Sequence, residues 1–188
     1  MTATPPAAKP AAPVCLGIEA GGTRTVAIAA GPGLDSPVRR EFGPANLFLL
    51  DERQLAHRLR SIARAMPRPD AIAIGMAGAR TDEDRARLRA AAAVAWPGVS
   101  CHATNDLETA LMAAPAAAWP RRAPRAERRT IDVRVAIVSG TGSCCFGRGA
   151  DGRTARVGGW GHVLGDKGSG YDIVVRALRA IVHDSDRA

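Results

Sequence analysis

Short apolar runs alternate with helical patterns along the first 114 residues. The runs Val14–Glu19 and Thr25–Ala30 flank a turn that contains two glycines, and this arrangement predicts a β-hairpin. Further strands are expected at Pro37–Phe42, Ala71–Met76 and Val99–Thr104. The second of these, AIAIGM, is apolar throughout, so we expect it to be a buried strand.

Three helices are expected in the same region. The first begins after Asp51, a good N-cap, and places Leu55, Leu59, Ile62 and Ala63 on one face. Thr81 caps the second helix, whose first turn is acidic and therefore suits the helix dipole, and which ends before Pro97. A short third helix is expected at Asp106–Ala114. Strands that alternate with helices in this way predict an α/β fold with a mixed sheet.

The pattern breaks after the third helix. Residues 115–130 hold three prolines and five arginines without periodicity, which predicts an exposed loop or insertion. The alternative is a basic arm that touches a phosphate-rich partner. Strands are then expected at Ile131–Ser139, Cys144–Arg148 and Arg153–Val157, and a final helix from Gly170 to His183.

Composition narrows the class of protein. The 188 residues are 46% hydrophobic with no long uncharged apolar run, which excludes a disordered chain and a membrane-spanning one. A net charge of +8 invites a nucleic-acid partner. However, Lys9 and Lys167 are the only lysines among 26 basic residues, so 24 are arginines, which indicates a general composition bias. No helix-turn-helix, zinc finger or RNA-binding signature is visible, so we expect no nucleic-acid partner.

The cysteines and the N-terminus indicate a reducing compartment. The four cysteines have no C-x-x-C spacing and are too sparse for a disulfide framework. Residues 1–13 are rich in Pro and Ala and lack the apolar region of a secretory signal, so a disordered tail is expected. These features predict a cytoplasmic protein.

Three glycine-rich turns, each directly after a predicted strand, carry the candidate chemistry. They are LGIEAGGTRT (Leu16–Thr25), VSGTGS (Val138–Ser143) and GGWGHVLGDKGSGYDI (Gly158–Ile173). Glycine lets backbone N–H groups approach a phosphate closely, and Thr and Ser hydroxyls add donors. Each turn alone is a weak signal, and none fits the P-loop or the dinucleotide fingerprint.

Taken together, the three motifs resemble the N-acetylglucosamine kinases, within the BadF/BadG/BcrA/BcrD-type ATPases of the actin, sugar-kinase and heat-shock-chaperone superfamily. The third motif is the most specific. The resemblance implies a ribonuclease-H-like mixed sheet flanked by helices, the actin-like ATPase domain, at residues 14–139. It further implies that residues 140–188 begin a second domain, which is truncated and leaves apolar surface exposed. ATP and Mg²⁺ are the implied cofactors.

The resemblance also implies roles for individual residues. Glu19 would help to position Mg²⁺ through water. The ATP phosphates would contact Gly21, Gly22, Thr23, Gly140, Thr141 and Gly142. The sugar would contact Asn46, Ser143, Gly159, Trp160, Gly161 and Asp166.

Asp106 is the candidate catalytic base. Sugar phosphorylation needs a carboxylate near the attacking hydroxyl, and Asp106 stands at a strand-to-helix junction in HATNDLETA. Taken alone, this position favours a helix cap, formed by Asp106 or by Asn105. The resemblance favours the base, because the family's catalytic Asp occupies the same place.

Other residues in the motifs favour structural roles. His162 in the third turn is expected to be a hydrogen-bonded structural residue, and Cys144 and Cys145 are expected to pack within a strand. The dehydratase-activating ATPases of the same group hold an iron–sulfur cluster, but their cysteine signature is not visible here. Lys167 stands where an acidic residue is common, which reverses a charge beside Asp166.

The motifs therefore predict an ATP-dependent kinase that phosphorylates the 6-hydroxyl of N-acetylglucosamine. A non-catalytic amino-sugar-binding or regulatory remnant and a BadF-type ATPase remain as alternatives. We expect an amino-sugar substrate, and either a homodimer or a second chain that completes the second domain. No membrane partner is expected.

Overall fold

The computed structural model describes residues 13–113 and 133–187. The expected tail and the 115–130 insertion therefore lie outside the described residues. The chain divides into two compact units, Met1–Asn105 and Asp106–Ala188. The family domain boundary expected after residue 139 stays a prediction.

The first unit is built on a five-stranded mixed sheet. Its strands are β1 (Cys15–Ala20), β2 (Thr25–Ala30), β3 (Val38–Phe42), β4 (Ala71–Met76) and β5 (Ser100–Thr104). Their order across the sheet is β3-β2-β1-β4-β5. The β1–β2 and β2–β3 pairs are antiparallel, whereas β1–β4 and β4–β5 are parallel. The predicted hairpin and the mixed sheet are confirmed.

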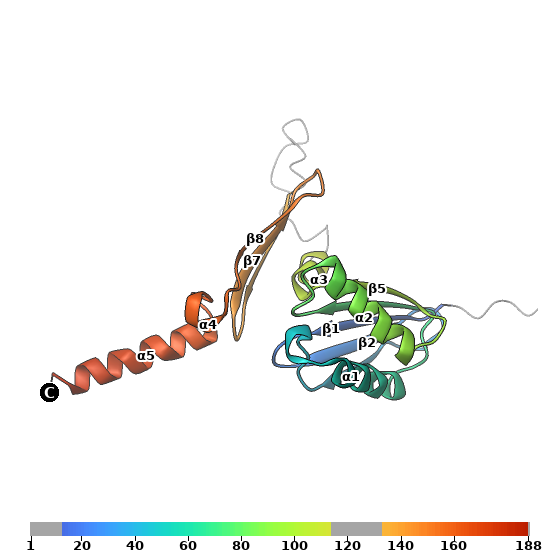
Figure 1. Cartoon of the computed structure of the whole chain (residues 1–188), viewed down its shortest axis with the longest axis horizontal. Helices are drawn as coiled ribbons and strands as arrows, with labels where there is room; N and C mark the ends of the chain where they lie inside the picture. The colour runs from blue at the N-terminus through green and yellow to red at the C-terminus, as the bar shows by residue number, and fades with distance from the viewer. Residues whose placement is uncertain (1–12, 114–132, 188) are drawn as a thin grey trace, which may run out of the picture. The chain divides into compact units, whose positions relative to one another are not determined.

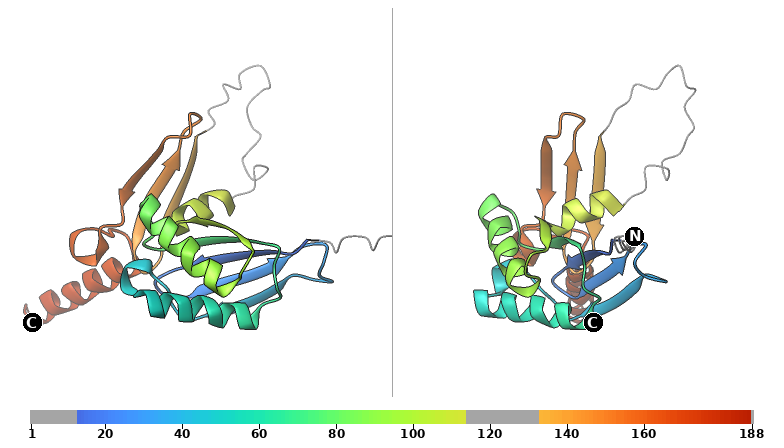
Figure 2. Two further views of the ribbon diagram at one scale, coloured as in Figure 1. Left: turned by 45° about the vertical axis from the view of Figure 1, so that its right-hand side comes forward. Right: turned by 90° about the vertical axis from the view of Figure 1, so that its right-hand side faces the viewer.

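Helices cover one face of this sheet, where α1 (Glu52–Ala65) and α2 (Asp82–Ala95) lie side by side (Figures 1 and 2). Both begin with a capping box, formed by Asp51 with Gln54 in α1 and by Thr81 with Asp84 in α2. Each box satisfies backbone N–H groups that the first helical turn cannot pair. The boundaries predicted from these caps are confirmed.

The core of the first unit lies between the sheet and the two helices. Alternate residues of β1, here Leu16 and Ile18, are buried on the helix side, together with their β4 partners Ile72 and Ile74. The predicted helix face contributes Leu55, Leu59 and Ile62 from α1. Because the period of a strand is two, the other face of β1 carries Gly17 and Glu19, which are exposed.

In the described residues of the second unit, an antiparallel meander is accompanied by three helices. It comprises α3 (Asp106–Ala113), β6 (Arg134–Ser139), β7 (Ser143–Arg148), β8 (Thr154–Gly158), α4 (Gly161–Leu164) and α5 (Gly170–Ser185). An ion pair of 3.7 Å between Glu108 and Arg148 connects α3 to β7. The short helix α4 was not predicted, because four residues in a glycine-rich loop have no apolar period.

This unit buries little apolar surface. Leu111 and Phe146 are the only buried apolar side chains among its described residues. One face of the sheet exposes Val135, Ile137 and Val157, and α5 exposes Val174, Leu178 and Ile181. The exposed apolar surface expected for this part of the chain is therefore present, and such patches are typical of interaction surfaces.

Candidate functional site

The first glycine-rich turn lies at the carboxyl ends of the parallel strands β1 and β4. The Gly21 N–H donates to the Arg24 carbonyl at 2.9 Å, which closes the turn between β1 and β2. The Ala45 N–H donates to the Gly21 carbonyl at 3.0 Å, and the Ala77 N–H to the Ala20 carbonyl at 2.8 Å. In open α/β sheets this edge is where ligands bind.

Asn46 is held at the same edge. The Leu47 N–H donates to the Ala77 carbonyl at 2.8 Å, and the Asn46 side chain caps the 3₁₀ turn η1 (Leu47–Leu49) by accepting from Phe48 N–H at 3.0 Å. A Cβ on Gly78, whose φ is +91°, would lie 2.6 Å from Asn46 Oδ1. Only glycine therefore leaves room for this amide. The structure brings Asn46 together with the first turn, as the site prediction requires.

In the second unit, the VSGTGS turn is joined to the loop that follows β8. The Gly170 N–H donates to the Gly140 carbonyl at 2.8 Å, and the Ser139 hydroxyl donates to the Gly168 carbonyl at 2.9 Å. The Ser143 hydroxyl donates to the Lys167 carbonyl at 2.7 Å. These bonds fix the two glycine-rich segments as one structure. The third motif therefore lies against the turn that contains Gly140, Thr141, Gly142 and Ser143.

Asp166 lies directly against the VSGTGS turn. A Cβ on Gly142 would lie 2.7 Å from Asp166 Oδ2, so the carboxylate occupies the space that glycine leaves open. Asp166 has a φ of +54°, the one positive value among described residues other than glycine. Such a conformation costs energy for most residues, and Asp tolerates it better than most. The loop therefore holds this carboxylate in a defined position.

Nearby charged groups act on the pKa of the Cys144 thiol. Burial, first of all, raises the pKa of the Cys144 thiol; the Arg156 guanidinium lowers this pKa, and the carboxylates of Asp106 and Asp166 raise it. The candidate base at the start of α3 and the candidate sugar ligand Asp166 thus act on the same thiol. The sequence predicted neither the effect of these charges on Cys144 nor the position of Arg156, because both depend on the strand register.

Trp160 is the N-terminal boundary of α4 and is 67% exposed. The Arg156 guanidinium carbon lies over its ring, 5.6 Å from the ring centre. Gly161 follows as the first residue of α4, and His162 packs against the ring of Tyr171 with ring centres 4.7 Å apart. The structure thus shows His162 in a packing contact between α4 and α5.

The end of the third motif forms the start of α5. Ser169 is fully buried and accepts from Asp172 N–H at 3.1 Å, while Asp172 accepts from Gly168 N–H at 2.8 Å. This backbone hydrogen bond, and then Arg176, holds the pKa of Asp172 below its usual range. The Lys167 ammonium lies 4.0 Å from Asp172 Oδ1, so its charge is paired within the same motif.

No group of three or more His, Cys, Asp or Glu side chains in residues 13–113 and 133–187 could hold a metal ion. A lone carboxylate at Glu19 nevertheless fits Mg²⁺, which keeps several waters and takes other ligands from phosphate oxygens. Glu19 stands one residue before the buried end of β1, on the exposed face of the sheet. A role for Glu19 in holding Mg²⁺ through water stays a prediction.

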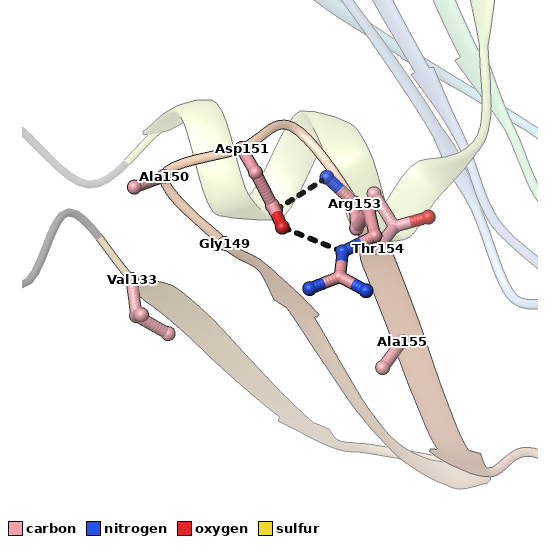
Figure 3. A pocket seen from close by; sticks show the side chains of 7 residues that line it. All are labelled: Val133, Gly149, Ala150, Asp151, Arg153, Thr154 and Ala155. Carbon is pink, nitrogen blue, oxygen red and sulfur yellow. Dashed lines mark hydrogen bonds and ion pairs between the residues drawn. The ribbon is translucent and has the colours of Figure 1, made fainter.

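A shallow hollow of about 600 Å³ lies elsewhere, at the far end of the β7–β8 hairpin (Figure 3). The Asp151 carboxylate, which lines it, accepts from the Arg153 backbone N–H at 3.0 Å and from Arg153 Nε at 2.5 Å. None of the residues that the motifs single out lines this hollow. We therefore place the candidate site at the glycine-rich loops.

Comparison with curated proteins identifies two relatives. The chain is 33% identical to an N-acetylmuramic acid/N-acetylglucosamine kinase from Clostridium acetobutylicum, over 184 aligned positions that cover 92% of this chain. It is 43% identical over 53 residues to an N-acetyl-D-glucosamine kinase from Dictyostelium discoideum, which covers 28% of this chain and 17% of that one. The predicted resemblance to N-acetylglucosamine kinases is confirmed. The chain spans about half (54%) of the length of the Clostridium relative.

Two solved structures show that the fold is shared with this kinase group. Candidate N-acetylglucosamine kinases from Chromobacterium violaceum and Porphyromonas gingivalis match with TM-scores of 0.66 and 0.62 and identities of 21% and 20%. The matches cover 90% and 92% of this chain, and 57% and 56% of those chains. The predicted actin-like ATPase fold is confirmed. No protein-family model matches the chain. No helix among the described residues is long and apolar enough to cross a membrane.

The first prediction concerns the pKa of the Cys144 thiol. This pKa can be measured from the alkylation rate against pH in a chain whose other three cysteines are replaced by serine. Asp106→Asn and Asp166→Asn should each lower the pKa of the Cys144 thiol, because each removes a negative charge that opposes the thiolate. Arg156→Met should raise it. Asp151→Asn, at the far end of the hairpin, should leave it unchanged. An Asp106→Asn variant with the parent thiol pKa would contradict the clustering of these groups.

The second prediction concerns pH. The folded pKa of Asp172 lies below its unfolded value, so its contribution to stability is present above about pH 4 and is lost as the pH falls through the folded pKa. Asp172→Asn should therefore destabilise the N-terminal turn of α5 at pH 7, and this effect should shrink as the pH falls through the folded pKa of Asp172. Amide exchange at Gly168 and Ser169 measures this, with Asp184→Asn at the other end of α5 as control. Equal exchange in the parent and Asp172→Asn at pH 7 would disprove the contribution.

Proposed function

We propose that this chain supplies phosphate- and sugar-binding parts of an ATP-dependent amino-sugar kinase that acts on the 6-hydroxyl of N-acetylglucosamine. One observation carries the proposal. The VSGTGS turn and the GGWGHVLGDKGSG loop are hydrogen-bonded into a single structure. The carboxylates of Asp106 and Asp166 both influence the thiol within it. Similarity over 92% of the chain to a relative named as an N-acetylmuramic acid/N-acetylglucosamine kinase supports the same assignment.

Asp106 is the proposed catalytic base. As the sugar hydroxyl oxygen bonds to the γ-phosphorus of ATP, its proton passes to the Asp106 carboxylate, and the bond from the γ-phosphorus to the bridging oxygen of ADP breaks. Phosphoryl transfer depends mainly on positioning and on stabilisation of charge. The Glu108–Arg148 ion pair, which joins α3 to β7, supports a fixed position for Asp106 at the beginning of α3.

Backbone N–H groups of both glycine-rich turns are the proposed donors to the ATP phosphates. Gly21, Gly22 and Thr23 would act from the first unit, and Gly140, Thr141 and Gly142 from the second. A Cβ added to Gly22 or to Gly140 would have no neighbour within 4 Å, so the space beside both is open. Mg²⁺, when bound, would neutralise charge on the phosphate oxygens. Glu19 would hold a water of its coordination shell.

The proposed sugar ligands are held in place within their own units. Asn46 is held in place by Gly78 and the turn η1, and Asp166 by the space that Gly142 leaves open. Ser143 can still accept a hydrogen bond while its hydroxyl proton is donated to Lys167. Gly159 and Gly161 would allow the backbone to approach the sugar, and Trp160 would offer its exposed ring. A cytoplasmic location and assembly with a second copy or a completing chain stay predictions.

The third prediction tests the base in an assay of ADP formation that depends on N-acetylglucosamine. Asp106→Asn should lower turnover by about 10²–10⁴-fold, the usual range for loss of a general base, while calorimetry shows unchanged sugar binding. Asp151→Asn is the matched control and should keep parent turnover. An Asp106→Asn variant with parent turnover would contradict the role of the base.

The same assay separates a kinase from a sugar-binding remnant. ADP formation that requires both ATP and the sugar supports the kinase. Sugar binding by calorimetry without any ADP formation would overturn catalysis by this chain and favour a non-catalytic sugar-binding protein.

A further inference from the structure

Arg156 is a charged residue of the candidate site to which the motifs assign no role. It lies on β8 opposite the buried Phe146 of β7, and two residues before Gly158, which pairs with Cys144. Because side chains alternate along a strand, Arg156 shares its face of the sheet with Phe146 and Cys144. The guanidinium therefore projects on the same side as the thiol that responds to Asp106 and Asp166.

Arg156 as a whole residue is half-buried, and its guanidinium has no carboxylate at ion-pair distance among the described residues. In contrast, Arg148, Arg153 and Arg176 of the same unit each pair with a carboxylate. Arg156 instead lies over the exposed ring of Trp160, 5.6 Å from its centre. A cation over an aromatic ring is attracted through the face of the ring.

This stacking leaves the fork of the guanidinium available. The N–H donors of arginine lie in the plane of the group and match the two oxygens of a carboxylate. An arginine fixed over Trp160 thus presents paired donors beside the ring against which the proposed function seats the sugar. Binding an acidic group there would also supply the partner charge that the guanidinium of this half-buried residue lacks.

We propose that Arg156 is a specificity-determining residue that binds the carboxylate of an amino sugar with an acidic substituent. The inference rests on the proposed function, because that function places the sugar at Trp160. The substrate class it names is an N-acetylated hexosamine with a carboxylate on an ether side chain, as in N-acetylmuramic acid. N-acetylglucosamine has the same ring without this group and would not use Arg156.

Calorimetry on the full chain tests the proposal with three probes: N-acetylglucosamine, N-acetylmuramic acid and the methyl ester of the latter. Arg156→Met should weaken binding of the acid by about 10- to 100-fold, the range for a lost charge-assisted hydrogen bond, and leave the other two sugars within about twofold. Arg156→Lys, which keeps the charge but loses the fork, should fall between parent and Met for the acid. The matched control is Arg153→Met. Arg153 lies in the connection between β7 and β8 and pairs with Asp151, so this variant should bind all three sugars as the parent does.

The outcomes separate this inference from the proposed function. Equal weakening of all three sugars by Arg156→Met would overturn the inference, because it would mean that Arg156 only supports Trp160. Unchanged binding of the acid by Arg156→Met would also overturn it. Binding of N-acetylglucosamine in each case leaves the proposed function standing. If the parent chain binds none of the sugars, the proposed function and this inference both fail.

Discussion

The backbone hydrogen bond from Gly170 to the Gly140 carbonyl is the constraint on which the candidate site depends. It fixes the start of α5 against the turn between β6 and β7, and the Ser139 and Ser143 hydroxyls reinforce it at either side of that turn. One backbone–backbone bond and two serine hydroxyls thus set the spacing of the two loops. The position of Asp166 against Gly142 follows from this spacing.

The two units are stabilised in different ways. The first encloses a core of its own between sheet and helices, so its loops at the ends of β1 and β4 rest on a rigid base. The second buries only Leu111 and Phe146 among its described apolar side chains, and relies on loop-to-loop hydrogen bonds and the Glu108–Arg148 ion pair. Its exposed apolar faces on the sheet and on α5 are the kind of surface that packs against other protein.

The sequence predicted the elements well where local signals were strong. Capping residues located α1 and α2, and the apolar run Ala71–Met76 is β4 to the residue. The glycine motifs predicted which segments would carry chemistry, a prediction that stands, but not that two of these segments are joined by hydrogen bonds. The helix α4, the positive φ of Asp166 and the stacking of Arg156 on Trp160 could not be predicted. Each depends on strand register or on a contact across the fold, neither of which a local pattern contains.

Hydrogen–deuterium exchange on the full chain, with and without N-acetylglucosamine, tests most directly whether the joined loops of the second unit form the sugar site. We expect slower exchange of the backbone amides at residues 139–143 and 158–170 when the sugar is present. Residues 149–153, at the far end of the same hairpin, should exchange at the same rate in both samples. Slower exchange at residues 149–153 with none at the joined loops would contradict the account.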